Sequence, residues 1–449
     1  MSARTTPERQ DLEREQLESL NHLLKQVGET NTFYRPVVQQ AGLADGAADL
    51  CEFSAKMPFS TKDAIAEDQQ QHPPYGTNLT YPIEQYSRFN QTSATTGRPI
   101  RWLDTTESWQ GLLENWKRVL AAAEVGQGNR LYFAFSFGPF LGFWTAFEAA
   151  SQLGCLCIPG GGLSSLGRLE AMRANRADVL LCTPTYAGRL AEVASAEGID
   201  LSEFAVRKII VAGEPGGSVL EVRRDLEHRW QGASLFDHHG MTEVGPVSYQ
   251  CPEKPGTLMI IGSAYLAEII DPESGEPVAR GDLGELVLTT LKRVASPLIR
   301  YRTGDLVRED LEVAGKFGHC ELGLAGGILG RVDDMVVVRG VNVYPSAVDA
   351  IMRSVPGTAE YRVTLVESKG MTEMEVEVEP GADVIDRAGL AKQVQAKLRT
   401  SLNLRVPVSL SGPESLPRFE MKARRWVRES SEGCRGAGSG TGKPHVAGG

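Results

Sequence analysis

Lys208-Ile209-Ile210-Val211-Ala212 is a short apolar run that ends at Gly213-Glu214-Pro215 and precedes a helical pattern over residues 219–230. The same alternation extends to both sides: apolar runs occupy residues 131–135, 155–158, 179–182 and 234–236, and helical patterns occupy residues 142–153, 166–175 and 186–197. Short apolar strands separated by helices are typical of parallel βαβ units. The sequence therefore predicts the α/β class with a parallel sheet, and ligands of such a sheet bind beyond the carboxyl ends of its strands.

The chain is long enough for more than one domain, because a single core stops growing at roughly 250–300 residues and this chain has 449. We predict a large N-terminal domain over residues 1–332, with helices in residues 8–40 and a small β-rich subdomain after residue 249. A small α+β domain is predicted over residues 333–428, with strands at 335–339, 360–367 and 373–379 and helices at 345–353 and 385–402. Residues 429–449 are rich in Gly, Ser and charged residues and are predicted to be disordered.

The composition favours small molecules as partners. A net charge of −10 argues against general binding to nucleic acid or to anionic membranes. The N-terminus lacks the apolar core of a signal peptide, and no uninterrupted apolar stretch approaches about 18 residues, so a cytoplasmic location is expected. The seven Cys residues suit reduced thiols better than a disulfide framework, and Cys155 and Cys182 lie in apolar runs that predict core positions.

Thr92-Ser93-Ala94-Thr95-Thr96-Gly97-Arg98-Pro99 is a run of hydroxyl side chains that ends in glycine, a cation and proline. Backbone N–H groups, hydroxyls and one positive charge can together surround a polyphosphate. The segment lacks the Gly-Lys-Ser/Thr ending of the Walker loop, which argues against an ordinary P-loop nucleotide hydrolase. Taken alone, the segment is better interpreted as a solvated turn.

Further segments downstream change that interpretation. They are Gly213-Glu214-Pro215, Gly240-Met241-Thr242-Glu243-Val244-Gly245-Pro246, Glu268-Ile269-Ile270-Asp271-Pro272, Pro297-Leu298-Ile299-Arg300-Tyr301-Arg302-Thr303-Gly304-Asp305, Gly330-Arg331-Val332-Asp333-Asp334-Met335 and Arg339-Gly340-Val341-Asn342-Val343-Tyr344-Pro345. From about residue 50 to about residue 427 the chain resembles the adenylate-forming superfamily of acyl-CoA synthetases, adenylation domains and luciferases. Within it, the chain is most similar to the phenylacetate-CoA ligase branch. The resemblance implies a small, mobile C-terminal lid domain.

The resemblance also implies roles for charged and hydroxyl side chains. Glu243 is expected to bind Mg²⁺, which takes hard oxygen ligands, and the Thr242 hydroxyl is expected to face the α-phosphate. Asp305 is expected to accept the ribose hydroxyls of ATP, and Arg331 to reach ribose or phosphate. Lys422 is expected to contact the acyl carboxylate and the α-phosphate as charge develops there.

The remaining implied roles concern nucleotide binding and domain motion. The phosphate loop would consist of Thr92, Ser93, Thr95, Thr96, Gly97 and Arg98, and the adenine site of Gly213, Glu214, Pro215, His239 and Gly240. Asp333 stands where the superfamily places the hinge of its rotating C-terminal domain.

Four positions depart from the superfamily pattern. Ala94 stands where Gly is usual, and Arg98 where Lys is usual, which keeps the charge but alters the reach. His239 stands where an aromatic Tyr would stack on adenine, so its imidazole would have to stack instead. Met421 stands where Gly precedes the catalytic Lys. These departures leave open a nucleotide-binding scaffold that has lost catalysis, although the retained charged residues favour an enzyme.

Two Cys residues are weighed as metal ligands. Some members of the resembled branch carry a structural zinc, and Cys251 and Cys320, with His319, are of the residue types that zinc selects. Only three candidate ligands occur where a closed site takes four, so zinc is not expected.

The function predicted is that of an AMP-forming acid–thiol ligase. A carboxylic acid and ATP would give acyl-AMP and pyrophosphate, and the thiol of coenzyme A would then displace AMP. The acid pocket would include residues 135–140, where Phe137 and Phe140 favour a flat, apolar acid such as phenylacetate or a benzoate relative. A carrier protein or a cofactor as the acceptor, and a homodimer as the assembly, are alternatives that the sequence leaves open.

Overall fold

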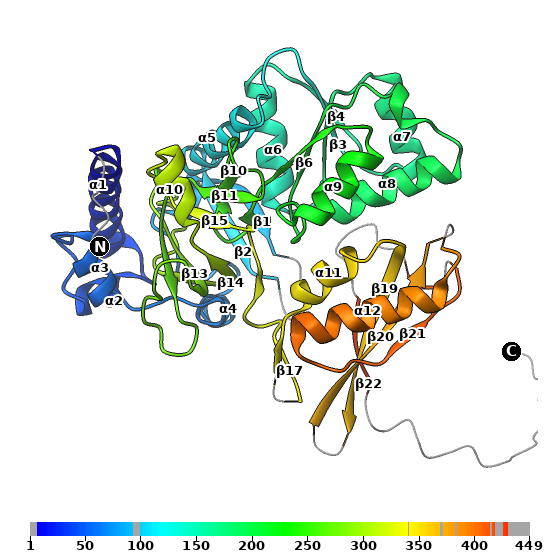
Figure 1. Cartoon of the computed structure of the whole chain (residues 1–449). Coiled ribbons are helices and arrows are strands. Elements are labelled where there is room, and N and C mark those ends of the chain that lie inside the picture. The colour runs from blue at the N-terminus through cyan, green and yellow to red at the C-terminus, as the bar shows by residue number, and fades with distance from the viewer. Residues whose placement is uncertain are drawn as a thin grey trace, which may run out of the picture. The chain divides into compact units, whose positions relative to one another are not determined.

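The computed structural model of the chain (Figure 1) describes residues 7–92, 99–339, 341–368, 371–381, 384–413, 415–417 and 425–429. The described residues form two compact units, and the chain passes from one to the other between Asp334 and Met335. Each unit has hydrophobic clusters of its own. Of the predicted tail over residues 429–449, only Glu429 is described, as the last residue of a strand, and residues 430–449 lie outside the described residues.

A five-stranded parallel sheet forms the centre of the first unit. Its strands are β3 (Arg130–Phe133), β4 (Leu156–Pro159), β5 (Val179–Cys182), β6 (Lys208–Val211) and β7 (Ser234–Asp237), in the order β4-β3-β5-β6-β7. The helices between them are α6 (Leu141–Gln152), α7 (Ser165–Ala174), α8 (Pro184–Ala196) and α9 (Leu220–Arg229). The structure therefore confirms the predicted α/β class with a parallel βαβ sheet (Figure 1).

Helices cover both faces of this sheet because successive side chains of a strand point to opposite faces. In β3, Leu131 and Phe133 belong to the hydrophobic cluster that contains α5 (Thr106–Ala122) and α6. Tyr132, between them, belongs to the cluster that contains α7, α8 and α9. The apolar runs in β3, β5 and β6 are continuous because both faces of these strands are buried, whereas β4, at the edge of the sheet, is only partly buried.

Antiparallel strands complete the first unit. One sheet contains β12 (Tyr265–Ile270), β13 (Leu283–Thr290), β14 (Tyr301–Arg308) and β16 (Gly330–Arg331), and another contains β10 (Ser248–Gln250), β11 (Thr257–Ile260) and β15 (Gly323–Ala325). Two pairs stand apart, β1 (Tyr86–Gln91) with β2 (Arg101–Thr105) and β8 (Gly240–Met241) with β9 (Gly245–Pro246). Helix α4 (Lys62–Gln71) and the short 3₁₀ turn η1 (Ile83–Gln85) precede β1, whereas the 3₁₀ turn η2 (Leu201–Glu203) and helix α10 (Leu311–Phe317) lie between later strands.

The N-terminal helices are built into the first unit. They are α1 (Pro7–Thr30), α2 (Arg35–Gln40) and α3 (Leu50–Lys56), and their apolar side chains share a cluster with Leu266, Leu291 and Ile299. Just before α4, the backbone of Ser60 pairs with the start of β14, donating to Arg300 O (3.0 Å) and accepting from Arg302 N (2.9 Å). This pairing places the first residue of α4 beside the strand that carries Asp305.

The second unit is an α+β body. Its main sheet has the order β21-β20-β19-β22, from β19 (Thr358–Ser368), β20 (Met371–Pro380), β21 (Val408–Leu410) and β22 (Trp426–Glu429). The hairpin β17 (Val336–Val338) and β18 (Val341–Val343) precedes it, and α11 (Pro345–Arg353) and α12 (Arg387–Leu402) pack on it. The helices and the long strands that the sequence predicts for this region are therefore present.

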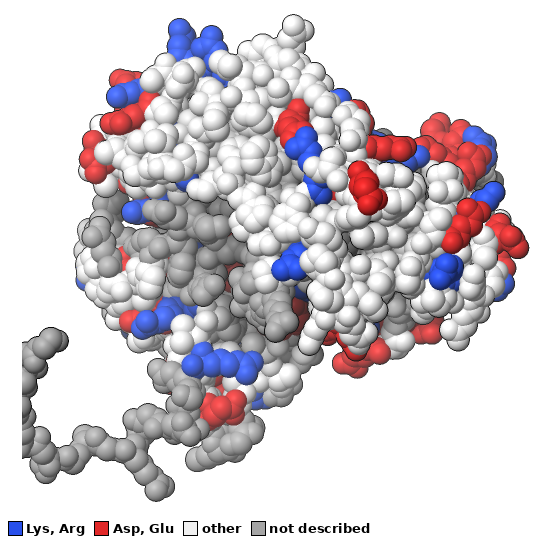
Figure 2. Space-filling view, turned by 180° about the vertical axis from the view of Figure 1, so that it is seen from behind, with Lys and Arg blue, Asp and Glu red and all other residues white. Residues whose placement is uncertain are grey.

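Charges of both signs are interspersed on the face of the molecule shown in Figure 2, and neither forms a large continuous area on the described part of that face. Among the described residues, no helix has both the length and the apolar composition needed to cross a lipid bilayer.

Candidate active site

Two predicted segments meet at the carboxyl edge of the parallel sheet, because β6 and β7 are neighbours. Gly213 follows β6 with φ of +91°, a conformation that favours glycine. Glu214 Oε1 accepts a hydrogen bond from Thr185 N in the first turn of α8 (2.7 Å). His239 follows β7 at the same edge. The structure thus brings the predicted adenine segment and the predicted His239 segment to the edge at which such sheets bind ligands.

Thr242 and Glu243 occupy the turn of a tight hairpin. Gly240 pairs with Pro246 and Met241 with Gly245, so few backbone geometries close the turn between them. Gly245 has φ of +96°, and a Cβ on Gly240 would lie 2.9 Å from the Gly245 carbonyl oxygen. The two glycines are therefore required by the turn that presents Thr242 and Glu243.

A buried ion pair supports this hairpin from beneath. Asp104, on β2, and Arg293, after β13, are 0% and 2% exposed and make two hydrogen bonds, of 2.7 Å and 2.6 Å. Arg293 Nη1 also donates to the backbone carbonyls of Thr242 (3.1 Å) and Glu243 (2.7 Å). A bidentate arginine–carboxylate pair fixes geometry in two directions, so Asp104 and Arg293 fix the backbone of the hairpin turn.

Asp305, on β14, is the centre of a polar cluster. Its Oδ2 lies 3.0 Å from His239 Nε2, and its Oδ1 accepts a hydrogen bond from Arg331 Nη1 (2.9 Å). Arg331 faces Asp305 across the β14–β16 pairing. Burial opposes the charge of Arg331, but the carboxylates of Asp305 and Asp333 outweigh it and raise the pKa of the guanidinium. Arg331 therefore stays a cation.

Glu243 belongs to the same neighbourhood. Tyr301, at the start of β14, is buried, and burial and then the negative charge of Glu243 raise its pKa. The cation of Arg331 acts in the opposite direction and lowers this pKa, whereas the carboxylate of Asp305 raises it. All three charged groups therefore act on one phenol. Glu243 itself is 6% exposed. Lys62, the first residue of α4, lies with Nζ 3.7 Å from Glu243 Oε1 and balances its charge.

Sequence reasoning missed three residues here, namely Lys62, Asp104 and Arg293. Lys62 follows Thr61, whose side chain accepts from Ala64 N, and an N-cap of this kind predicts only a helix start. Asp104 stands in Trp102-Leu103-Asp104, a stretch that gives no sign of a buried carboxylate. Each of the three residues could be recognised only from its partner, which lies far away in the sequence.

The structure describes only some of the residues predicted for the hinge and the phosphate loop. Asp333 is 67% exposed at its side chain and accepts from Arg331 Nε (2.8 Å). Thr92 Oγ1 accepts from Ile100 N (3.0 Å), and Thr92 N donates to Ile100 O (2.9 Å), which closes the base of the loop. Outside the described residues lie Ser93, Ala94, Thr95, Thr96, Gly97, Arg98, Met421 and Lys422.

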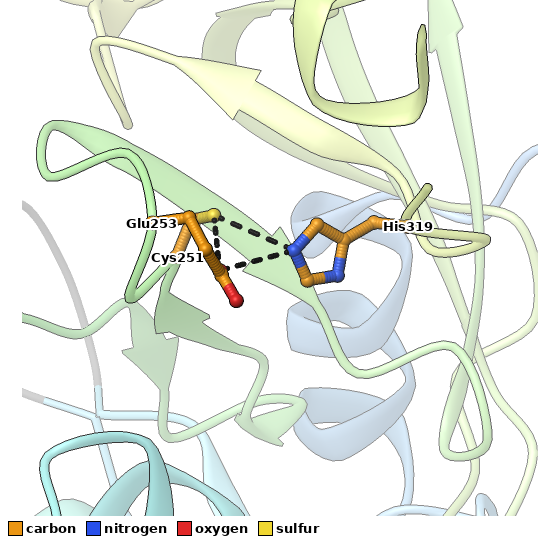
Figure 3. Close-up of side chains that lie close together, drawn as sticks. All are labelled: Cys251, Glu253 and His319. Atoms are coloured by element: carbon orange, nitrogen blue, oxygen red, sulfur yellow. Dashed lines mark hydrogen bonds and ion pairs between the residues drawn. The ribbon is translucent and has the colours of Figure 1, made fainter. Parts of the chain in front are cut away.

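The weighed metal ligands give a different trio from the one expected. Cys251 Sγ lies 3.8 Å from His319 Nε2 and 3.4 Å from Glu253 Oε2, and His319 Nε2 lies 3.2 Å from Glu253 Oε2 (Figure 3). Cys320 is not a member of this group of close ligand atoms. Burial raises the pKa of the Cys251 thiol. Three donors fall short of a closed zinc site, and the absence of zinc stays a prediction.

The comparisons with known proteins agree with this geometry. The sequence profile described as "AMP-binding enzyme" matches residues 45–292, and the profile of the "AMP-binding enzyme C-terminal domain" matches residues 340–429. The chain belongs to the AMP-binding enzyme family. Phenylacetate-coenzyme A ligases of Thermus thermophilus and Pseudomonas putida are each 31% identical over 92% of this chain and over 96% and 93% of their own lengths.

A solved structure extends the similarity of this AMP-binding enzyme to its whole length. The crystal structure of 2-hydroxyisobutyryl-CoA ligase in the postadenylation state matches with a TM-score of 0.87 at 27% identity, and covers 95% of this chain and 93% of that one. Family membership confirms the predicted relationship to adenylate-forming enzymes and to phenylacetate-CoA ligases. It also confirms the predicted enzyme class, the AMP-forming acid–CoA ligases.

The buried ion pair makes a first prediction. Arg293→Met leaves the Asp104 carboxylate buried without its partner, which should lower the free energy of unfolding by about 3–5 kcal/mol. The double variant Asp104→Asn/Arg293→Met removes both charges and should lose less of this free energy. Urea unfolding measures the free energy of unfolding of each variant. Arg280→Met is the control, because Arg280 pairs with Glu309 at a side chain that is 54% exposed, where a pair contributes at most about 1 kcal/mol. Equal losses in Arg293→Met and Arg280→Met would contradict the supporting role.

His238, beside His239, makes a second prediction. Its Nδ1 donates to the Ser248 carbonyl oxygen (2.6 Å), and burial lowers its pKa from 6.5 to about 4. Between those values the unfolded chain binds a proton that the folded chain does not, so stability should fall as pH falls from 6.5 towards 4, by about 3 kcal/mol at most. His238→Asn keeps a donor for Ser248 without a titratable ring. Urea unfolding from pH 7 to pH 4.5 should show a shallower decline in that variant, and identical slopes would refute the assignment.

Proposed function

We propose that the chain is an ATP-dependent carboxylate–CoA ligase that forms an acyl-AMP and pyrophosphate, and then an acyl-CoA and AMP. The observation that carries the proposal is the convergence of Glu243, Asp305 and Arg331 around buried Tyr301 in a member of the AMP-binding enzyme family. A sugar edge needs an acceptor, a polyphosphate needs a cation, and a metal ion needs a hard oxygen ligand. Asp305, Arg331 and Glu243 respectively are groups of these three kinds.

The nucleotide would be held at several points. Asp305 would accept the ribose hydroxyls, because a carboxylate only accepts and a hydroxyl can donate. Arg331 would pair with ribose or phosphate, and Thr242 would face the α-phosphate from the hairpin turn. Backbone groups of residues 213–215 would line the adenine, with His239 and Gly240 across from them. The phosphate loop over residues 92–98 would enclose the β- and γ-phosphates.

Glu243 fits the magnesium site that the family implies. It is a buried hard-oxygen donor in a rigid turn, and Mg²⁺ binds through one or two carboxylates together with substrate phosphates. When bound, the ion would neutralise phosphate charge during transfer. Lys62 would balance Glu243 before nucleotide and metal arrive, since its Nζ lies 3.7 Å away on a side chain that is 51% exposed.

The chemistry asks for positioning more than for acid–base catalysis. An ionised carboxylate is already a nucleophile, so the attack on the α-phosphorus needs alignment and charge stabilisation. Lys422 would stabilise the charge that develops between the acyl carboxylate and the α-phosphate. Asp333 would serve as the hinge when the C-terminal domain exchanges one half-reaction for the other. Coenzyme A would be the thiol acceptor in the second half-reaction.

An aromatic acid is the substrate class that the aromatic side chains near the sheet edge favour. Phe135 and Phe143 stack with centroids 4.0 Å apart, and Phe137 packs against Trp144 at 4.9 Å. These rings come from the segment after β3 and from α6, and they are only partly buried. A partly exposed aromatic wall without charges suits a flat apolar acid such as phenylacetate or a benzoate relative. A short hydroxy acid is the competing class, because a 2-hydroxyisobutyryl-CoA ligase has a similar fold.

Three further points are proposed on the same basis. Coenzyme A is preferred to a carrier protein or a cofactor as the acceptor, because the similar proteins that span the whole chain are CoA ligases. Catalysis is preferred to a scaffold role, because Glu243, Asp305 and Arg331 are assembled together. A cytoplasmic location and a homodimer stay predictions.

Pyrophosphate release tests the proposed function. The purified chain, with ATP and Mg²⁺, is offered phenylacetate, benzoate, anthranilate, 2-hydroxyisobutyrate and fatty acids, each with and without coenzyme A. We expect release with the aromatic acids, increased by coenzyme A because the thiol clears the acyl-AMP. Pyrophosphate release that is unchanged by coenzyme A would point to another acceptor. Binding of ATP without release for any acid would refute the ligase.

Lys422→Ala tests how the half-reactions are divided. We expect loss of adenylate formation by at least about 100-fold, because the developing charge loses its cation. Thioester formation from supplied acyl-AMP should be nearly unchanged. Arg425→Ala is unsuitable as a control because Arg425 pairs with Glu360, so Lys397→Ala, on α12, serves instead. Equal loss of both half-reactions in Lys422→Ala would refute this role.

A further inference from the structure

The Asp305 carboxylate has a second polar partner besides Arg331. His239 Nε2 lies 3.0 Å from Asp305 Oδ2, and both side chains are largely buried, 12% and 7% exposed. An ionised carboxylate can only accept, so the His239 nitrogen must donate and the ring must carry a proton on Nε2. The contact uses the edge of the imidazole, whereas stacking on a base would use only its face.

The rest of the His239 residue is held in place by its backbone. His239 N donates to Ser248 Oγ (3.1 Å), and His239 O accepts from Val247 N (3.0 Å) and Ser248 N (3.1 Å). The other ring nitrogen, Nδ1, is buried and has no hydrogen-bond partner among the described residues. The side chain therefore has one polar contact within the described structure, and that contact is Asp305.

Counting lone pairs shows what this contact leaves available. A carboxylate offers about four acceptor sites, of which His239 and Arg331 each take one. The remaining sites suffice for two hydroxyl donors, which is the number that a ribose 2′,3′-diol presents. Because the two protein donors bind different oxygens of Asp305, they restrict rotation of the carboxylate about its Cβ–Cγ bond.

We propose that His239 is a positioning residue for ribose recognition: its Nε2–H fixes the Asp305 carboxylate so that the free lone pairs of Asp305 meet the sugar diol. The inference rests on the proposed function, because it takes Asp305 as the ribose acceptor. It adds that the preference for a ribonucleotide depends on His239, a residue that need not touch the sugar. The contribution of His239 appears only when the nucleotide has hydroxyls to offer.

Two substitutions separate the edge of the ring from its face. His239→Phe keeps a planar ring that can stack but removes the Nε2–H donor. His239→Gln removes the ring but can place an amide N–H where Nε2 stood. Their melting temperatures show whether each variant is folded, and His239→Leu replaces His239→Phe if the latter is not.

The measurement is the dissociation constant of ATP and of 2′,3′-dideoxyATP for the full-length protein, by titration calorimetry with Mg²⁺. Wild type should bind ATP more tightly than the dideoxy analogue by about tenfold or more, as expected for hydrogen bonds to a charged group. His239→Phe should shrink that ratio about fivefold or more, because only ATP has hydroxyls that the fixed carboxylate can accept. His239→Gln should restore most of the ratio. In pyrophosphate exchange, the same pattern should appear in the KM for ATP and not in kcat.

The outcomes separate this inference from the function on which it rests. If wild type discriminates between the two nucleotides but His239→Phe weakens both equally, the positioning role is overturned and the ribose site at Asp305 stands. If His239→Phe changes neither dissociation constant, the role is likewise overturned. If wild type itself does not discriminate, Asp305 is not the ribose acceptor, and the inference falls together with that part of the proposed function.

Discussion

The buried pair of Asp104 and Arg293 is the interaction on which the site depends. It joins β2, the segment after β13 and the hairpin turn that presents Thr242 and Glu243. Moving a charge out of water costs several kcal/mol for each ion. The Asp104–Arg293 pair offsets this cost because the Asp104 carboxylate and two backbone carbonyls accept hydrogen bonds from the guanidinium. Such an arrangement contributes little net stability compared with an apolar core. The effect of the pair is to hold the turn at Thr242 and Glu243 in a single position.

A second property of the site is that its carboxylates are paired with donors from the protein itself. Asp305 has Arg331 and His239 as partners, and Glu243 has Lys62. Balanced charges let buried carboxylates exist in a folded protein without neutralising themselves. Their donors are also fixed before ATP arrives, which reduces the reorganisation that binding and transfer require. The same partners that stabilise these carboxylates therefore prepare the site for its substrate.

Sequence patterns predicted the sheet because its signal is local. The apolar run at residues 208–212 and the helical pattern after it need no knowledge of the rest of the chain, and β6 ends within one residue of the expected position. The motif residues Glu243, Asp305 and Arg331 were identified by resemblance, and the structure brings them together. Arg293 could not be identified in this way, because its burial depends on Asp104, 189 positions earlier. The trio at Cys251 was missed for the same reason: Glu253 resembles any surface acid until His319 is placed beside it.

The N-terminal helices share their hydrophobic cluster with Leu266, Leu291 and Ile299. This arrangement bears on the order in which the molecule can be assembled during synthesis. Leu24 leaves the ribosome roughly 240 residues before Leu266, which at about 5–20 residues per second corresponds to a delay on the order of 10–50 s. Throughout that interval the cluster of the N-terminal helices lacks the cover that Leu266, Leu291 and Ile299 supply. The first helices made thus complete their docking late, and until then their uncovered apolar side chains offer a surface for a chaperone.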